Sequence, residues 1–288
     1  MDKNIKSFLG FNSEYENAEI VSFGCPFDGT TSFRPGTRFA PDVIRMESYG
    51  LETYSPYLDR DLIEITAYDA GDLQFPFGNT EKVLEIIEDF TDRVVEDGKK
   101  VLMVGGEHLV SLPVIKSVHK KYKDLHVIHF DAHTDLRDFF KGEPLSHATV
   151  LKKVWDFLGD GKLFQYGIRS GDKEEFYWAK EHTFLNKYDF TGLNYAVEQI
   201  GDKPVYLTID LDVLDPSAFP GTGTPEPGGV TFKELMDALN TIKNLNIVGA
   251  DIVELAPHYD HSGISNAVAC KVLREVALIM GCKAFSKK

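Results

Sequence analysis

The chain has 288 residues, of which 43% are hydrophobic and 26% are charged, and its formal net charge is -14. No apolar run approaches the roughly 18 to 20 residues of a membrane-spanning helix, and the N-terminal stretch is too polar for a signal peptide, so we expect a cytoplasmic protein. The acidic balance disfavours binding to nucleic acid or to an anionic membrane, and it would attract a small cationic substrate.

Short runs rich in β-branched and other apolar residues predict buried strands. In chain order they cover 20–24, 64–71, 101–106, 126–132, 163–169, 204–210 and 246–254. Pro41 is typical of the first turn of a helix. Apolar side chains three or four residues apart predict a helix over 79–98, and Thr231 and Glu234 have the spacing of a capping box before a helix that reaches 244.

Strands that alternate with helices predict an α/β fold, in which helices cover both faces of a parallel sheet. No internal repeat and no linker divides the chain, so we expect a single domain over 1–288. The longest irregular stretches, 24–42 and 215–230, are rich in glycine and proline. Long loops of this kind in a compact domain are often functional.

Side chains that bind metals follow four of the predicted strands. Ligands of open parallel sheets bind at the carboxyl ends of the strands, so these side chains should converge. A strand returns to the same face at every second residue, which lets neighbouring ligands of one strand act together. The candidates are His108 after one strand, Asp131, His133 and Asp135 after the next, Asp210 and Asp212 after a third, and Glu254 after a fourth.

Two imidazoles and four carboxylates are too many ligands for one tetrahedral zinc ion. Two cations that share carboxylates fit better, and a set rich in oxygen favours Mn²⁺. Two ions about 3.5 to 4 Å apart would lower the pKa of a water molecule between them, which indicates a hydrolase. A single aspartate after a strand also occurs as a loop cap, but unpaired carboxylates packed together would repel one another.

Five motifs occur in the order found in the ureohydrolase family, which includes arginase and agmatinase. They are GGEH at 105, DAHTD at 131, SHATV at 146, IDLDVLDPSAFPGTGTP at 209 and DIVELAP at 251. The resemblance covers nearly the whole chain. It implies a three-layer α/β/α sandwich with a mostly parallel sheet of about eight strands, a centre of two manganese ions, and a homo-oligomer, either a trimer or a hexamer.

The resemblance also implies a role for each residue of the site. One manganese ion would be held by His108, Asp131, Asp135 and Asp210, and the other by Asp131, His133, Asp210 and Asp212. Asp135 would orient the bridging hydroxide, and Glu254 would pair with the guanidinium group of the substrate. His147 would contact the substrate and transfer a proton to the leaving amine, although it could also simply begin a helix. Thr224 would line the substrate pocket.

Substrate choice depends on the segment after DAHTD, where arginases resemble one another in having an asparagine that Arg137 replaces here. The stretches DLRD, EPLSHATV and VELAPHYD resemble the agmatinase branch, which hydrolyses agmatine to putrescine and urea. If Arg137 points into the pocket, it would repel the ammonium group of agmatine and bind a carboxylate instead. We expect it to face solvent or to pair with Asp138 or Glu143.

Several alternatives stay open at this point. Other guanidino or formimidoyl substrates are N1-aminopropylagmatine, guanidinobutyrate, arginine and formimidoylglutamate. A single-zinc enzyme similar to a deacetylase would leave Asp135 and Asp212 without a task, and a non-catalytic scaffold predicts a lost ligand, whereas none is lost here.

Overall fold

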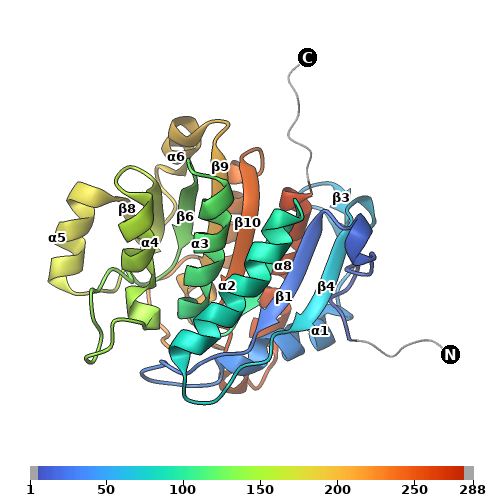
Figure 1. The fold of residues 1–288 in the computed structure, drawn as a ribbon, viewed down its shortest axis with the longest axis horizontal. Coiled ribbons are helices and arrows are strands. Elements are labelled where there is room, and N and C mark those ends of the chain that lie inside the picture. Colours follow the sequence, from blue (N-terminus) through green and yellow to red (C-terminus); the bar gives the residue numbers. More distant parts are fainter. Residues whose placement is uncertain (1–5, 282–288) are drawn as a thin grey trace.

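Eight parallel strands form one central sheet in the computed structural model, which describes residues 6–281 (Figure 1). In spatial order they are β4 (Ala67–Asp72), β1 (Ile20–Cys25), β5 (Lys100–Gly105), β10 (Asn246–Val253), β9 (Pro204–Asp210), β6 (His126–Phe130), β7 (Leu163–Ile168) and β8 (Phe184–Lys187). Each neighbouring pair runs parallel, so the carboxyl ends of all the strands lie at the same edge of the sheet.

Helices cover both faces of the sheet, which confirms the predicted three-layer α/β/α fold (Figure 1). One layer contains α2 (Thr80–Glu96), α3 (Ser111–Lys121) and α4 (Val150–Leu158). The other layer contains α1 (Ala40–Ser48), α6 (Leu193–Ile200), α7 (Phe232–Ile242) and α8 (Ile264–Met280). The remaining helix, α5 (Lys173–His182), packs beside the edge strand β8, and a short antiparallel pair joins β2 (Tyr54–Ser55) to β3 (Arg60–Asp61).

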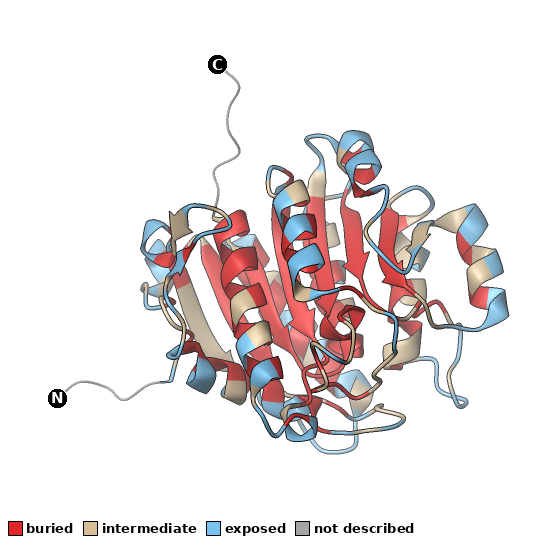
Figure 2. Ribbon diagram, turned by 180° about the vertical axis from the view of Figure 1, so that it is seen from behind, coloured by how far each residue is buried: buried red, intermediate tan, exposed pale blue. Residues whose placement is uncertain are grey.

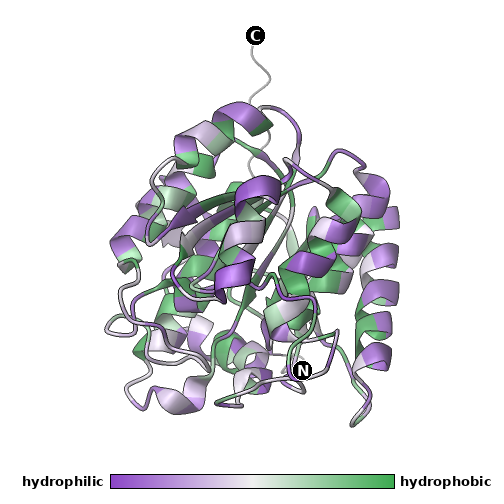
Figure 3. Ribbon diagram, turned by 90° about the vertical axis from the view of Figure 1, so that its left-hand side faces the viewer, coloured by the Kyte–Doolittle hydropathy of each residue, from purple (hydrophilic) through white to green (hydrophobic). Residues whose placement is uncertain are grey.

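The sheet is buried between two hydrophobic cores because successive side chains of each strand point to opposite faces. In β5, for example, Leu102 packs in the core under α8, whereas Val101 and Met103 pack in the core under α2 and α3. Figure 2 shows the strands buried along most of their length. Figure 3 shows hydrophobic residues along the strands and on the inward sides of the helices, so the outer helix surfaces are polar.

The predicted helices are confirmed, together with their capping residues. Asn79 caps α2, where its side chain accepts a hydrogen bond of 2.9 Å from the N–H of Lys82. Thr231 and Glu234 form the predicted capping box before α7, and Pro41 lies in the first turn of α1. Among residues 6–281, no helix is both long and apolar enough to cross a membrane.

Every predicted strand is present; several boundaries differ by one or two residues, one start differs by three, and one edge strand is additional. The strand predicted from residue 64 begins at Ala67, because Leu62–Glu64 form a 3-10 turn that is capped by Asp61. The strand β8 was not predicted, since its four residues are only partly buried and carry a weak apolar pattern. The extent of a single domain over 1–288 stays a prediction.

Candidate metal centre and catalytic cavity

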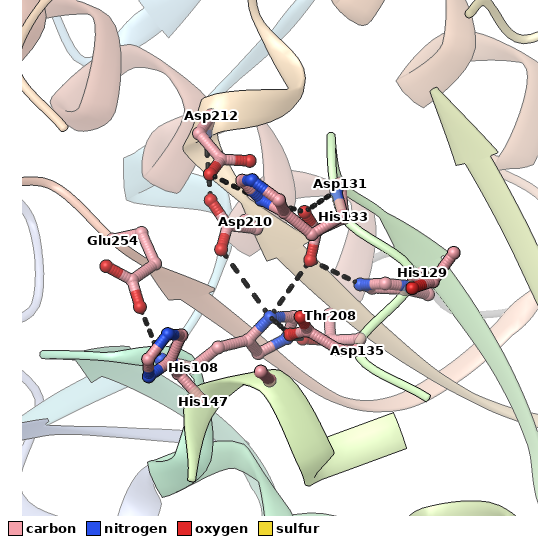
Figure 4. Close-up of polar contacts among 12 residues, drawn as sticks. His108, His129, Asp131, His133, Asp135, His147, Thr208, Asp210, Asp212 and Glu254 are labelled. Carbon is pink, nitrogen blue, oxygen red and sulfur yellow. Dashed lines mark hydrogen bonds and ion pairs between the residues drawn. The ribbon is translucent and has the colours of Figure 1, made fainter. Parts of the chain in front are cut away.

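The predicted metal ligands converge at the carboxyl ends of β5, β10, β9 and β6, which are neighbours in the sheet (Figure 4). His108 opens a 3-10 turn just after β5, and Asp210 is the last residue of β9. All of these side chains are buried except that of His133, which is 24% exposed. The structure therefore brings together His108, Asp131, His133, Asp135, Asp210, Asp212 and Glu254.

The Nδ1 atom of His108 faces three carboxylates. It lies 3.1 Å from an oxygen of Asp131, 3.1 Å from an oxygen of Asp135 and 3.5 Å from an oxygen of Asp210. This buried nitrogen has no partner with hydrogen-bond geometry among the described residues. A buried polar atom without a hydrogen bond is costly, and ligand atoms that surround one point suit a cation. The donor set thus fits a bound metal ion.

The hydrogen bonds of the other ring nitrogen determine the tautomer of His108. Its Nε2 atom lies 2.9 Å from the hydroxyl oxygen of Thr208. Thr208 donates its own proton to Asp251 at 2.7 Å, and the hydroxyl of Tyr206 donates to the second oxygen of Asp251 at 2.7 Å. The Thr208 oxygen must therefore accept a hydrogen bond from Nε2–H, which leaves the lone pair of Nδ1 free for a metal ion.

A second group of ligands surrounds His133. Its Nδ1 atom lies 3.0 Å from an oxygen of Asp212 and 3.4 Å from Oδ1 of Asp131. Because Oδ2 of Asp131 faces His108, this carboxylate is shared by both groups. The residues Asp131, His133 and Asp212 are close enough together to hold one ion, and a carboxylate shared in this way is suited to bridge two ions.

Sequence reasoning missed His129, which lies two residues before Asp131 on the same face of β6. Its Nε2 atom is 2.7 Å from Oδ2 of Asp131, and its Nδ1 accepts a hydrogen bond of 3.1 Å from the amide of Gln165. His129 therefore donates to Asp131 and orients this carboxylate. The spacing of two residues was a signal for this contact, but the histidine stands inside an apolar run and was included in the predicted strand.

The carboxylates of the site are crowded. Burial raises the pKa of Asp210 well above its ordinary range, and the neighbouring Asp212 and Asp131 raise it further. Burial and then Asp131 raise the pKa of Asp135 to about 7, while burial and then Glu107 raise the pKa of Glu254 well above its ordinary range. Each shift reflects an unfavourable negative charge, and bound cations would relieve it.

Two of the candidate catalytic residues have backbone conformations that are uncommon for residues other than glycine. The φ angle is 52° at Asp135 and 65° at Glu254. The carbonyl oxygen of Asp135 accepts hydrogen bonds from Leu151 and Lys152 in the first turn of α4, and Oε1 of Glu254 accepts one of 2.8 Å from the N–H of His108. Such strained positions persist where the surroundings hold them, which is frequent at functional sites.

His147 both begins a helix and borders the site. Ser146 caps the 3-10 turn that leads into α4, and His147 is the first residue of that turn. Its N–H donates to the hydroxyl of Thr30 at 3.2 Å, and its Nε2 lies 3.3 Å from the hydroxyl of Ser32. Burial, followed by the charge of nearby His133, lowers the pKa of His147 to about 4. The ring is therefore neutral at pH 7 and can accept a proton.

The loop that carries Thr30 is anchored by Glu107, whose contacts sequence reasoning did not identify. The buried carboxylate of Glu107 accepts hydrogen bonds from the N–H of Thr30 at 2.8 Å, from the Thr30 hydroxyl and from the Thr31 hydroxyl at 3.2 Å. A Cβ atom at Gly106 would clash with the carbonyl oxygen of Phe27, so only glycine allows the loop to pack this closely. These contacts hold the loop against His147.

Thr224 lies in the second long loop, which Asp215 closes. Thr224 donates to an oxygen of Asp212 at 3.2 Å. Asp215 accepts hydrogen bonds from Ser217 and from the N–H groups of Gly228 and Gly229. The hydrogen bonds from Ser217, together with those from the two glycines, lower the pKa of Asp215 to about 2. An ionised Asp215 thus joins the two ends of the loop.

A cavity of about 180 Å³ adjoins the ligands, and we call it the catalytic cavity. Its walls include His133, Asp135, His147 and Thr224 from the predicted site. Other residues of the cavity wall include Ser32, Phe140, Arg137 and Glu175. A larger cavity of about 650 Å³, bounded by the segments 29–32, 78–81 and 140–146, adjoins it at Ser32 and Phe140. His147 and Asp135 can therefore be reached by a small molecule.

Arg137 borders the catalytic cavity, and the prediction that it pairs with Asp138 or Glu143 is wrong. Its guanidinium group pairs with Glu175 and with Asp172, each at 3.2 Å. Asp138 instead lies 3.5 Å from the ammonium group of Lys152. Tertiary structure explains the difference. The start of α5 brings both carboxylates to Arg137, although they lie 35 or more residues away in the chain.

Comparisons with known proteins identify the family of the chain. The arginase family model matches residues 18–279. The agmatinase of Bacillus anthracis is 51% identical over 95% of this chain and 96% of that protein, and the guanidinobutyrase of Pseudomonas aeruginosa is 30% identical over 97% of this chain and 98% of that protein. The crystal structure of agmatine ureohydrolase of Thermoplasma volcanium, 33% identical, has a TM-score of 0.87 and covers 96% of this chain and 95% of that chain.

Replacement of Thr208 by valine tests the tautomer of His108. The substitution keeps the shape of the side chain and removes the acceptor for Nε2–H. We expect the affinity for Mn²⁺ to fall by roughly 10- to 100-fold, as measured by isothermal titration calorimetry. Thr241→Val is the control, because that hydroxyl bonds only within α7. An unchanged affinity in Thr208→Val would show that the hydrogen bond between His108 and Thr208 does not support the metal centre.

Asp215→Asn tests the closure of the second loop. Because the folded pKa of Asp215 is below the unfolded value of about 3.9, its ionised form stabilises the protein above that pH, and the contribution is lost as pH falls toward 2. We expect Asp215→Asn to lower the free energy of unfolding by about 1 kcal/mol at pH 7. Denaturant titrations should show this difference narrowing between pH 4 and pH 2; a constant difference would contradict the assignment.

Proposed function

The chain belongs to the agmatinase branch of the arginase family, and we propose that it hydrolyses agmatine to putrescine and urea with two Mn²⁺ ions. One observation carries the proposal beyond the family. The lone pair of the buried His108 Nδ1 faces three carboxylates, and one of these, Asp131, also faces the pair formed by His133 and Asp212. This arrangement supports two adjacent cation sites.

We assign the ligands of the two ions from their positions around the two histidines. Asp131 would bridge the ions, and Asp210 would bridge them as well, since its side chain faces His108 while its Oδ1 accepts a hydrogen bond from the N–H of Asp212. The full sets are His108, Asp131, Asp135 and Asp210 for one ion, and Asp131, His133, Asp210 and Asp212 for the other. When bound, the ions would lower the pKa of a water molecule and so supply a hydroxide nucleophile near neutral pH.

The protein groups around the centre would bind and orient the guanidinium group. The carboxylate of Glu254 is buried and held by the N–H of His108 through Oε1, so we propose that it pairs with the guanidinium nitrogens. Asp135 would accept a hydrogen bond from the attacking nucleophile and orient it. Thr224, which lies in the wall of the catalytic cavity, would contact the substrate.

His147 would bind the substrate and transfer the proton that the leaving amine requires. Its ring is neutral at pH 7 because burial lowers its pKa, so it can take a proton and pass it to the amine as the C–N bond breaks. Ser32 would hold the ring through Nε2, while Thr30 accepts a hydrogen bond from the backbone N–H of His147. The trimeric or hexameric assembly and the cytoplasmic location stay predictions.

A single-zinc enzyme is not favoured by the geometry. Asp135 lies 3.1 Å from His108, and Asp212 lies 3.0 Å from His133, so both of the carboxylates that such an enzyme would not need are placed among the ligands. None of the predicted ligands lies away from the cluster, which argues against a non-catalytic scaffold.

The proposed activity is tested by urea release from the Mn²⁺-loaded protein. Agmatine, arginine, guanidinobutyrate and N1-aminopropylagmatine should be compared side by side. We expect the highest kcat/KM with agmatine, because the site is acidic and contains no unpaired cation for a carboxylate among the described residues of the cavity wall. A higher kcat/KM with arginine or guanidinobutyrate would refute the choice of substrate.

His147→Ala tests the proton transfer. We expect kcat for agmatine to fall by roughly 10²- to 10⁴-fold, the usual contribution of a positioned acid or base, while the content of bound metal is unchanged. His261→Ala is a matched control, because His261 is exposed in the loop before α8. If His147→Ala retains the wild-type kcat, the proton must take another route.

A further inference from the structure

Arg137 and Glu175 form a wall that is common to two cavities. Both residues line the catalytic cavity, and both also line a neighbouring cavity of about 450 Å³. The side chain of Arg137 is 27% exposed, whereas that of Glu175 is 6% exposed. The charge on this wall therefore lies at the boundary of both cavities.

The wall contacts the proposed catalytic residues through an aromatic ring. The guanidinium carbon of Arg137 lies 4.7 Å from the centre of the Phe140 ring, and the edge of Phe140 packs against His147 with ring centres 5.5 Å apart. Arg137 also donates its backbone N–H to the carbonyl oxygen of Ala148 at 3.2 Å. Its position relative to His147 is therefore determined by both the main chain and the side chain.

The carboxylates that pair with Arg137 are held by the first turn of α5. Glu175 accepts hydrogen bonds from the Thr134 hydroxyl at 2.6 Å, from the N–H of Leu136 at 2.9 Å and from the N–H of Asp172 at 2.6 Å. Asp172 caps the helix in a capping box with Glu175. These bonds hold the Glu175 carboxylate beside Arg137, and the ion pair with Asp172 engages the guanidinium group a second time.

The cluster of Arg137, Glu175 and Asp172 has one formal positive charge and two formal negative charges. We propose that this cluster selects the charge of the substrate's tail: while both carboxylates pair with Arg137, the wall attracts an amine and rejects a carboxylate. This proposal rests on the proposed guanidine hydrolysis and adds to it a basis for the choice of substrate. Removal of one carboxylate would expose the guanidinium group and shift the preference toward an acidic tail.

Asp172→Asn is the decisive variant. Asparagine caps a helix as well as aspartate does, so α5 should be preserved while one charge that pairs with Arg137 is lost. Asp138→Asn is the matched control. Asp138 lines the same neighbouring cavity and its loss changes the net charge equally, but it pairs with Lys152 and not with Arg137. Arg137→Gln removes the positive charge of the cluster and should shift the substrate preference in the opposite direction.

The measurement is kcat/KM for three guanidines of similar length: agmatine with a cationic tail, 4-guanidinobutyrate with an anionic tail, and butylguanidine with a neutral tail. We expect Asp172→Asn to lower the ratio of agmatine to guanidinobutyrate by about 3- to 10-fold, as one charge at a partly exposed site allows. Arg137→Gln should raise this ratio. Asp138→Asn should leave it within roughly twofold, and this control should turn over butylguanidine as the wild-type protein does.

Several results would overturn the proposal. Equal shifts in Asp172→Asn and Asp138→Asn would assign the effect to net charge rather than to the cluster, and an unchanged ratio in Asp172→Asn would remove the cluster from substrate choice. In both cases wild-type turnover of agmatine would leave the proposed function intact. If the wild-type protein releases urea from none of the three guanidines, the proposed function fails and this proposal fails with it.

Discussion

Burial of four carboxylates and two imidazoles at one edge of the sheet is the constraint on which the site depends. Parallel strands end at the same edge, so β5, β10, β9 and β6 bring these groups together although they are far apart in the chain. Burial and mutual repulsion make the ionised carboxylates unfavourable, as the raised pKa values of Asp135 and Asp210 reflect. Bound cations would compensate this cost, so the architecture and the proposed chemistry would have one physical origin.

Residues outside the cavity hold this arrangement in place. Thr208 determines the tautomer of His108, and His129 orients Asp131, so these two ligands have hydrogen-bond partners on their far sides. Glu107 anchors the first long loop against His147 through Thr30. These partners lie on the strands or directly after them, where the backbone is rigid. His147 and Thr224, which we propose to contact the substrate, come in contrast from the segments outside the strands, which can vary while the metal centre is kept.

The strands, the principal helices and the ligand set could be predicted because each depends on local patterns: apolar runs, capping residues and the spacing of two residues along a strand. The partners of the ligands could not. Contacts such as Thr208 with His108 or Glu175 with Arg137 join residues far apart in the chain, and no local pattern marks them. Arg137 illustrates the difference, since its position was predicted to matter but its charge balance depends on the first turn of α5.

The number of metal ions per chain tests the account most directly. The metal-free protein should be reconstituted with Mn²⁺, dialysed, and analysed by inductively coupled plasma mass spectrometry, with protein concentration measured independently. Two ions per chain are expected, because Asp131 faces both His108 and His133 and is shared by two ligand groups. One ion per chain, or a single tightly held zinc ion that Mn²⁺ does not replace, would contradict the dinuclear centre.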